Sequence, residues 1–275
     1  MTIADVDFGR LYREHMQAAA RIPKPPGAWD SRARDLQQKW RHSRYAEAFI
    51  ARMDLSGART LLDVGCGPGT IALPLASRLE RVYGLDYSGA MLEALRANAA
   101  EMELENVEAL HRAWEDDWSD VPACDIVVAS RSMNVPDMAE ALAKLNAAAR
   151  RRVYLTHQVE RRQFDPGALE AMGRKLLPPP DYIYIVNILH AMGIHPRLDY
   201  IESEQRLAPA ADFDEYARRI AWSLGELAPG ELTRLRTWYE RSHASSIQRE
   251  PGTMRWAFIS WEKNHMPRTR APESS

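Results

Sequence analysis

Cysteine is scarce in this sequence, and an excess of charge of either sign is missing. Its two cysteines among 275 residues, Cys66 and Cys124, are too few for a disulfide framework or a four-cysteine zinc site, so we expect a reducing compartment. The 36 lysines and arginines and the 38 aspartates and glutamates give a net charge of −2. Such a balance provides no global basic field, and this disfavours nucleic acid as a partner.

Long apolar runs are missing as well. The N-terminal residues are charged and lack the apolar stretch of a secretory signal, and no run approaches the length of a membrane span. We therefore expect a cytoplasmic protein with no membrane partner. We expect no metal site either, because His111, His157, His190 and His195 lack the spacing of metal ligands.

Instead, strand-like and helix-like segments alternate from about residue 60 onward. Short aliphatic and β-branched runs predict strands at residues 60–65, 81–86, 106–111, 124–130, 151–157, 197–205 and 253–263. Leucine, alanine and methionine favour helices at 71–80, 88–102 and 137–149 between the first five of them. This alternation implies right-handed crossovers, and it predicts an α/β fold with a doubly wound, mostly parallel, seven-stranded sheet.

The segments outside this alternation are mostly helical. Residues 5–20 and 31–53 show helical periodicity around a proline-rich break, which predicts an N-terminal helical cap over residues 1–55. The main domain then spans residues 56–265, with a lid insertion at about 157–196 that holds helices near 164–176 and 181–193. Two more helices are expected within 212–241, and residues 266–275 should form a flexible tail.

A glycine-rich loop follows the first predicted strand. The strand ends at Asp63 and runs into Gly65, Gly67 and Gly69, which permit a tight turn and let a ligand lie against bare backbone. The loop lacks the lysine of a phosphate-binding P-loop, and Thr70 stands where a dinucleotide fingerprint has glycine or alanine.

The second predicted strand ends at Asp86. A carboxylate at that position can accept hydrogen bonds from both hydroxyls of a ribose. Together with the D-x-G-x-G-x-G loop, it predicts a site for a nucleoside that carries an amino-acid tail.

Two motifs carry a family resemblance. LLDVGCGPGT, at residues 61–70, and YGLDYSGAMLEAL, at residues 83–95, resemble the first two motifs of the class I S-adenosylmethionine-dependent methyltransferases, in the small-molecule branch that contains the ubiquinone/menaquinone-type enzymes. The resemblance covers roughly residues 28–156. It implies a Rossmann-like methyltransferase fold, S-adenosylmethionine as cofactor with S-adenosylhomocysteine as product, and methyl transfer to an O, N, S or C atom of a small acceptor.

The resemblance also implies roles for individual residues. Asp63, Gly65 and Gly67 would border the methionine moiety, with Cys66 between the two glycines as a small filler, and Asp86 would hold the ribose. The adenine would lie near Tyr87, Met91, Ala113, Trp114 and Glu115. Ala113 replaces the acidic residue that the family often has there. Ser130 and Arg131 would reach the sulfonium side, where Arg131 would pair with the methionine carboxylate or with a substrate anion.

Candidate acceptor residues come from outside the central motifs. They are Trp29, Arg32 and Tyr45 near the N-terminus, and Tyr182 and Asn187 on a helix expected over the cleft. His157, directly after the fifth strand, and His190 are candidate general bases, although a structural role is the more common one for such histidines.

The motifs leave other activities open. The sequence of the binding loop does not indicate which S–C bond of the cofactor breaks, so transfer of the aminocarboxypropyl group is an alternative. A non-catalytic nucleoside sensor or partner subunit is another. The aromatic last strand could also serve as the interface of an oligomer.

Overall fold

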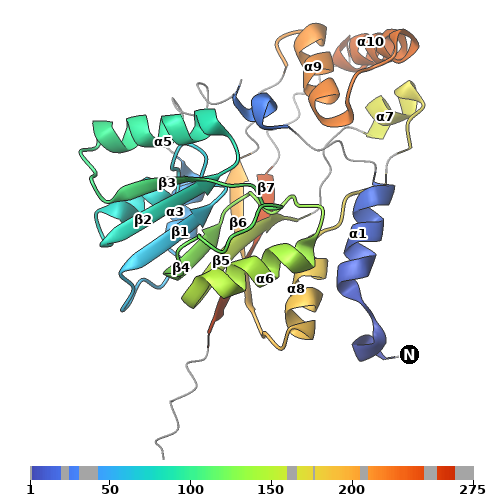
Figure 1. Ribbon diagram of the computed structural model, residues 1–275. Coiled ribbons are helices and arrows are strands. Elements are labelled where there is room, and N and C mark those ends of the chain that lie inside the picture. The colour runs from blue at the N-terminus through green and yellow to red at the C-terminus, as the bar shows by residue number, and fades with distance from the viewer. Residues whose placement is uncertain are drawn as a thin grey trace, which may run out of the picture.

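The computed structural model describes residues 2–19, 25–30, 43–159, 166–175, 177–204, 210–244 and 253–263. Their strands form one seven-stranded sheet in the order β3-β2-β1-β4-β5-β7-β6 (Figure 1). Strands β1 to β5 pair in parallel, and β7 runs antiparallel between β5 and β6. This confirms the predicted α/β fold. The strands are β1 (Thr60–Val64), β2 (Arg81–Asp86), β3 (Val107–His111), β4 (Cys124–Ala129), β5 (Ala149–Gln158), β6 (Arg197–Glu204) and β7 (Thr253–Glu262).

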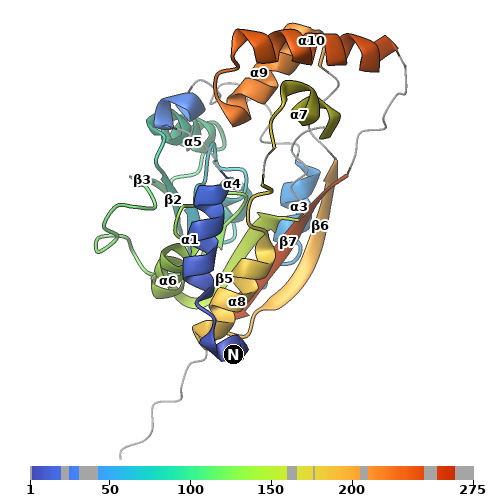
Figure 2. The same cartoon turned by 90° about the vertical axis from the view of Figure 1, so that its right-hand side faces the viewer.

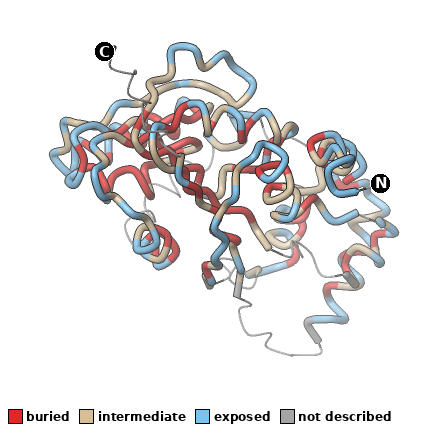
Figure 3. Tube along the Cα trace, turned by 90° about the horizontal axis from the view of Figure 1, so that it is seen from below, coloured by how far each residue is buried: buried red, intermediate tan, exposed pale blue. Residues whose placement is uncertain are grey.

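Helices cover both faces of the sheet, and the buried residues run through the middle of the molecule (Figure 3). One face packs against α3 (Arg44–Ile50), α4 (Ala72–Ala76) and α5 (Gly89–Glu101). The other packs against α1 (Phe8–Ala18), α6 (Met138–Ala148) and α8 (Tyr182–Ala191). Side chains just before five of these helices accept a hydrogen bond from the first turn, which fixes where each helix begins: Asp7, Ser43, Ser88, Asp137 and Asp181.

Helix α8 differs from the expected lid helix over the cleft. Its apolar side, formed by Ile185, Ile188 and Leu189, belongs to the same core as the central strands. This i, i+3, i+4 spacing is the stripe by which a helix packs on a sheet. Helix α8 therefore lies on a face of the sheet and not above its edge.

The helices above the carboxyl edge of the sheet form a cluster with its own core. We call α7 (Pro166–Met172), α9 (Phe213–Leu224) and α10 (Pro229–Ala244) the lid cluster; they follow the carboxyl ends of β5 and β6 and gather away from the sheet layers (Figure 2). Phe213, Ile220 and Leu235 are buried among them. Arg174 binds Glu231 through two hydrogen bonds of 2.6 and 2.8 Å, tying the segment after α7 to α10.

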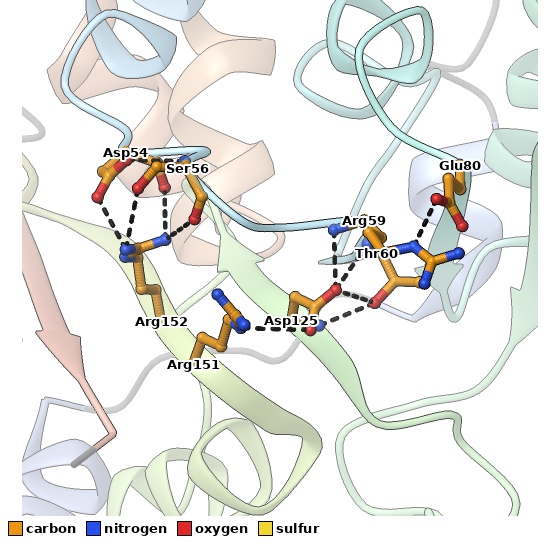
Figure 4. Close-up of polar contacts among 8 residues, drawn as sticks. All are labelled: Asp54, Ser56, Arg59, Thr60, Glu80, Asp125, Arg151 and Arg152. Atoms are coloured by element: carbon orange, nitrogen blue, oxygen red, sulfur yellow. Dashed lines mark hydrogen bonds and ion pairs between the residues drawn. The ribbon is translucent and has the colours of Figure 1, made fainter. Parts of the chain in front are cut away.

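The opposite edge, where the parallel strands begin, is held by ion pairs (Figure 4). Asp125 on β4 accepts hydrogen bonds from the backbone N–H of Thr60 at 3.1 Å and faces Arg151 at 3.8 Å. Arg152 on β5 pairs with Asp54 at 2.8 Å. The basic run at residues 150–152 is thus partly neutralised within the fold. A groove of ≈ 890 Å³ lies beside this edge, between the end of β7 and the start of β6.

Within the described ranges, none of the helices combines the length and the apolar character that crossing a membrane requires.

Candidate functional site

The glycine loop between β1 and α4 presents bare backbone at the carboxyl edge. Gly65 and Gly67 both have positive φ, 69° and 54°. A Cβ at Gly65 would lie 2.3 Å from the Cβ of Ser132, so this position accepts nothing larger than glycine. At Gly67 the nearest neighbouring atom, the Sδ of Met91, would be 4.0 Å from an added Cβ, which leaves room for a ligand against the main chain.

The carboxylate of Asp86 lies directly against this loop. Its Oδ2 accepts a hydrogen bond of 2.9 Å from the N–H of Gly67, and its Oδ1 accepts one of 2.9 Å from the N–H of Ser88. Burial, at 6% exposure, raises its pKa. The backbone N–H of Tyr87 is a third donor to this carboxylate. Because a carboxylate has about four lone-pair sites, it still has room to accept from a sugar hydroxyl.

Asp63 places a second carboxyl group below the same loop. It is 1% exposed, and its Oδ2 accepts a hydrogen bond of 3.1 Å from the N–H of Ala72 at the start of α4. Burial, together with the negative charge of Asp86, raises its pKa to about 7. Two carboxyl groups so close together favour a cationic ligand.

Cys66 lies inward within the loop, 3.0 Å from where a Cβ on Gly84 would be. Burial raises the pKa of its thiol well above the usual value, so it packs as an inert filler.

Residues expected near an adenine gather beside Asp86, at the turn from β2 to α5. The hydroxyl of Tyr87 interacts with the indole of Trp29, and its pKa is raised to about 12 by burial and by the charges of Asp86, Glu115 and Asp30. Asp30 also accepts a hydrogen bond of 2.5 Å from Ser88 Oγ. The N-terminal segment around residues 25–30 thus docks on this turn.

The loop after β3 contributes to the side of the site where an adenine is expected. It has Ala113 in place of the acidic residue that the family often has there. The N–H of Ala113 donates to Asp116 at 2.7 Å, and its C=O accepts from the indole of Trp118 at 2.9 Å. Trp114 stacks on Trp118 with ring centroids 5.3 Å apart. On α5, Met91 is buried, and its sulfur approaches Gly67.

The turn after β4 brings together residues that are far apart in the sequence. The hydroxyl of Tyr45 on α3 lies 2.9 Å from Ser130 Oγ and 2.6 Å from Thr156 Oγ1. The guanidinium of Arg131 lies over the ring of Tyr45, 4.3 Å from its centroid, and 6.0 Å from a ring of Trp256 on β7. Tyr45, Ser130 and Arg131 were predicted site residues, whereas Thr156 and Trp256 were not.

The two candidate histidines lie in different places. His157 is 2% exposed near the end of β5, with Nδ1 3.2 Å from the C=O of Gln158. Strand alternation points it to the face opposite Thr156, toward α1 and α8. His190 is exposed at the far end of α8, beside His195 just before β6. The fold therefore does not bring His190 to the carboxyl edge.

The remaining predicted acceptor residues have local partners or fall outside the description. The hydroxyl of Tyr182 pairs with that of Tyr200 at 2.8 Å, and Asn187 Nδ2 donates to the C=O of Ile183 on its own helix. Arg32 lies outside the described residues. Across the part of the chain that the structure describes, no three His, Cys, Asp or Glu side chains are grouped to hold a metal ion.

Comparisons with known proteins find methyltransferases among those that this chain resembles. A family model described as a methyltransferase domain matches residues 61–152. An uncharacterized protein of Haemophilus influenzae is 36% identical over 95% of this chain and 98% of its own length. Two other matches cover less of each protein. The ubiquinone biosynthesis O-methyltransferase of Alkalilimnicola ehrlichii is 40% identical over 30% of this chain and 34% of that protein. The 23S rRNA (uracil(1939)-C(5))-methyltransferase RlmD of Alcanivorax borkumensis is 26% identical over 61% of this chain and 37% of that protein.

Among solved structures, the YcgJ protein from Bacillus subtilis superposes with a TM-score of 0.55 at 15% identity, over 81% of this chain and 99% of that one. A putative methyltransferase from Bacillus halodurans superposes with a TM-score of 0.53 at 14% identity, over 79% of this chain and 98% of that one. These likenesses concern the fold.

Proposed function

Since the chain belongs to the class I S-adenosylmethionine-dependent methyltransferases, we propose that it transfers the methyl group of S-adenosylmethionine to a small-molecule acceptor. The observation that carries this proposal is the bare turn at Gly67 with the carboxylate of Asp86 against it.

The residues of the site fit S-adenosylmethionine. The open space at Gly67 accommodates a ligand on the backbone, and Asp86 still has room to accept from a ribose hydroxyl. The buried carboxyl of Asp63 suits the ammonium group of the amino-acid end of the cofactor. When bound, S-adenosylmethionine supplies an activated methyl group on a sulfonium.

The chain itself then has to orient the acceptor and exclude water. The lid cluster stands above the carboxyl edge for this purpose, and Trp222 on α9 contacts Trp29 with ring centroids 6.0 Å apart. If the acceptor must lose a proton, His157 is the candidate base.

One observation favours a small acceptor over RNA. The basic run at residues 150–152 lies at the edge opposite the glycine loop, and Arg151 and Arg152 face Asp125 and Asp54 there.

Cofactor binding tests the first half of the proposal. We expect calorimetric titration to show binding of S-adenosylhomocysteine, and Asp86→Ala and Asp86→Asn to weaken it about tenfold or more, because charge-assisted bonds to the ribose are lost. Asp54→Ala, which removes an aspartate at the opposite edge, is the matched control and should bind normally. If neither S-adenosylmethionine nor its product binds the folded wild type, the proposal is wrong.

Product analysis tests the second half. With S-adenosylmethionine and a panel of small phenols, amines, thiols and carboxylic acids, methyl transfer must release S-adenosylhomocysteine. Release of methylthioadenosine would instead mean aminocarboxypropyl transfer. Tight cofactor binding without turnover of small molecules or RNA transcripts would indicate the sensor alternative.

A further inference from the structure

Three hydroxyl groups from different parts of the chain form a hydrogen-bonded series beside the glycine loop. Thr156 Oγ1 on β5 lies 2.6 Å from the hydroxyl of Tyr45 on α3, and this hydroxyl lies 2.9 Å from Ser130 Oγ at the end of β4. Thr156 and Tyr45 are buried, whereas Ser130 is half-buried. The series therefore begins in the core and ends at a residue that a ligand can reach.

A backbone group fixes the direction of these hydrogen bonds. The N–H of Arg131 donates to Thr156 Oγ1 at 3.0 Å, so this oxygen already accepts one bond. A hydroxyl also has one hydrogen to donate, and a buried donor without a partner is costly. Within the described part of the chain, the oxygen that can accept from Thr156 is that of Tyr45. Thr156 therefore donates to Tyr45.

The same direction continues to Ser130. Burial raises the pKa of Tyr45, so its hydroxyl keeps its single hydrogen. Because the oxygen of Tyr45 accepts from Thr156, that hydrogen is donated to Ser130 Oγ. Among the contacts of the described residues, Tyr45 is the hydrogen-bond partner of Ser130 Oγ. Ser130 thus accepts from the protein and can donate its own hydrogen to a ligand.

Ser130 belongs to the end of the site that suits an amino acid. Two residues further along, Ser132 Oγ donates to the C=O of Val64 at 2.6 Å, which fixes the turn after β4 against the start of the glycine loop. The negative charge of Asp63 reaches Tyr45 and adds to the rise in the pKa of that tyrosine. An α-amino acid carries its ammonium group and its carboxylate on the same carbon atom. A donor close to Asp63 is therefore suited to the carboxylate.

We propose that Thr156 and Tyr45 are positioning residues that make Ser130 a hydrogen-bond donor to the carboxylate of bound S-adenosylmethionine. This proposal rests on the proposed function. The role of Thr156 is to set the direction of the series. Without its hydrogen, the oxygen of Tyr45 would accept from Ser130 and would compete with the ligand for that hydrogen.

Two ligands that differ only in the carboxylate test this role. S-adenosylhomocysteine carries the carboxylate, and its decarboxylated analogue, S-adenosyl-3-thiopropylamine, keeps only the ammonium group. We expect calorimetric titration of the wild type to show a tenfold or greater preference, about that of a hydrogen bond to a charged group, for S-adenosylhomocysteine. Ser130→Ala should reduce this preference about tenfold and leave binding of the analogue unchanged.

Variants of Thr156 and Tyr45 separate the direction of the series from support of the fold. Thr156→Val and Thr156→Ala, which both remove the hydroxyl, should lower the preference about as much as Ser130→Ala, and Thr156→Ser should retain it. Adding Tyr45→Phe to either variant removes the competing oxygen and should restore most of the preference, whereas damage to the fold would not be repaired by a second deletion. Thr60→Val is the matched control, because Thr60 Oγ1 also accepts from a backbone N–H, that of Asp125 at 2.9 Å, at the opposite edge.

Three results would overturn the proposal. The wild type could bind both ligands equally, or the preference could survive in Ser130→Ala, which would assign the carboxylate to another group. The double variants could also show the same low preference as the single variants of Thr156, and the hydroxyls would then only support the turn. If neither ligand binds the folded wild type, the proposed function fails instead.

Discussion

At the scale of single residues, the carboxyl group of Asp63 has a folded-state pKa of about 7 against an ordinary value of 3.8, because it is buried near Asp86. Between these values the folded protein holds a proton that the unfolded chain has released. The stability that this proton contributes is complete below about pH 4 and is lost as the pH rises through 7.

We therefore expect the free energy of unfolding to decrease as the pH rises from about 4 to 7, because Asp63 loses its proton in the folded protein. The decrease due to Asp63 is at most about 1.4 kcal/mol per pH unit. Asp63→Asn removes the titrating group and should flatten the profile across this window, as measured by urea unfolding at several pH values. Asp54→Asn, at the opposite edge, should leave the slope unchanged. An unaltered profile in Asp63→Asn would contradict the assigned pKa.

Residues near the motifs were predictable from the sequence, and their partners were not. Asp63, Gly67 and Asp86 belong to one strand–loop–helix–strand unit, formed by residues that are close in sequence. The local pattern of strand, loop and helix is therefore enough to predict that they lie at the same edge of the sheet. Thr156 reaches Tyr45 across 111 positions of sequence. That contact depends on the pairing of β4 with β5 and on the packing of α3, neither of which is encoded locally.

At the scale of elements, the helical segment at residues 26–30 connects two parts of the molecule. Asp30 accepts hydrogen bonds from Ser88 at the start of α5, while Trp29 contacts both Tyr87 and Trp222 of α9. A ligand beside Asp86 therefore meets a segment that also touches the lid cluster.

We predict that S-adenosylhomocysteine slows amide hydrogen exchange in α9 as well as in the turn from β2 to α5. Trp222→Ala breaks the ring contact with Trp29 and should remove the protection of α9 while keeping that of the turn. Trp238→Ala, another lid tryptophan, which stacks on Tyr216, is the control and should keep both. Persistent protection of α9 in Trp222→Ala would show that the coupling runs elsewhere.

Helix α8 shows what periodicity alone leaves undecided. Its apolar stripe was visible in the sequence, and it correctly indicates a helix with one buried side. The stripe does not say whether the partner is a sheet face or a lid. Here Tyr182 and Asn187 were expected on a helix over the cleft, whereas α8 packs across the sheet with α1 and α6, which carries His190 away from the glycine loop.

At the scale of the whole molecule, the lid cluster and the sheet bury separate sets of apolar residues. A unit with its own core can open or unfold while the rest stays folded. The pair of Arg174 and Glu231 supports that unit: the hydrogen bonds from Arg174 lower the pKa of Glu231 to about 2, and Arg174 also donates to the C=O of Leu224. The stability that the ionised carboxylate of Glu231 contributes to the folded protein is complete above its ordinary pKa of 4.5. It is lost as the pH falls toward 2.

We expect Glu231→Gln to speed hydrogen exchange in α7, α9 and α10 about tenfold or more at neutral pH, because Arg174 loses a charged, bidentate partner that is mostly shielded from solvent. Strands β1, β4 and β5 should exchange at the wild-type rate, since their core does not include the lid. Glu80→Gln, which removes the ion pair with Arg59 at the opposite edge, should leave lid exchange unchanged. Equal acceleration in strands and lid would mean that the molecule unfolds as one unit, and the lid could then not open independently to admit an acceptor.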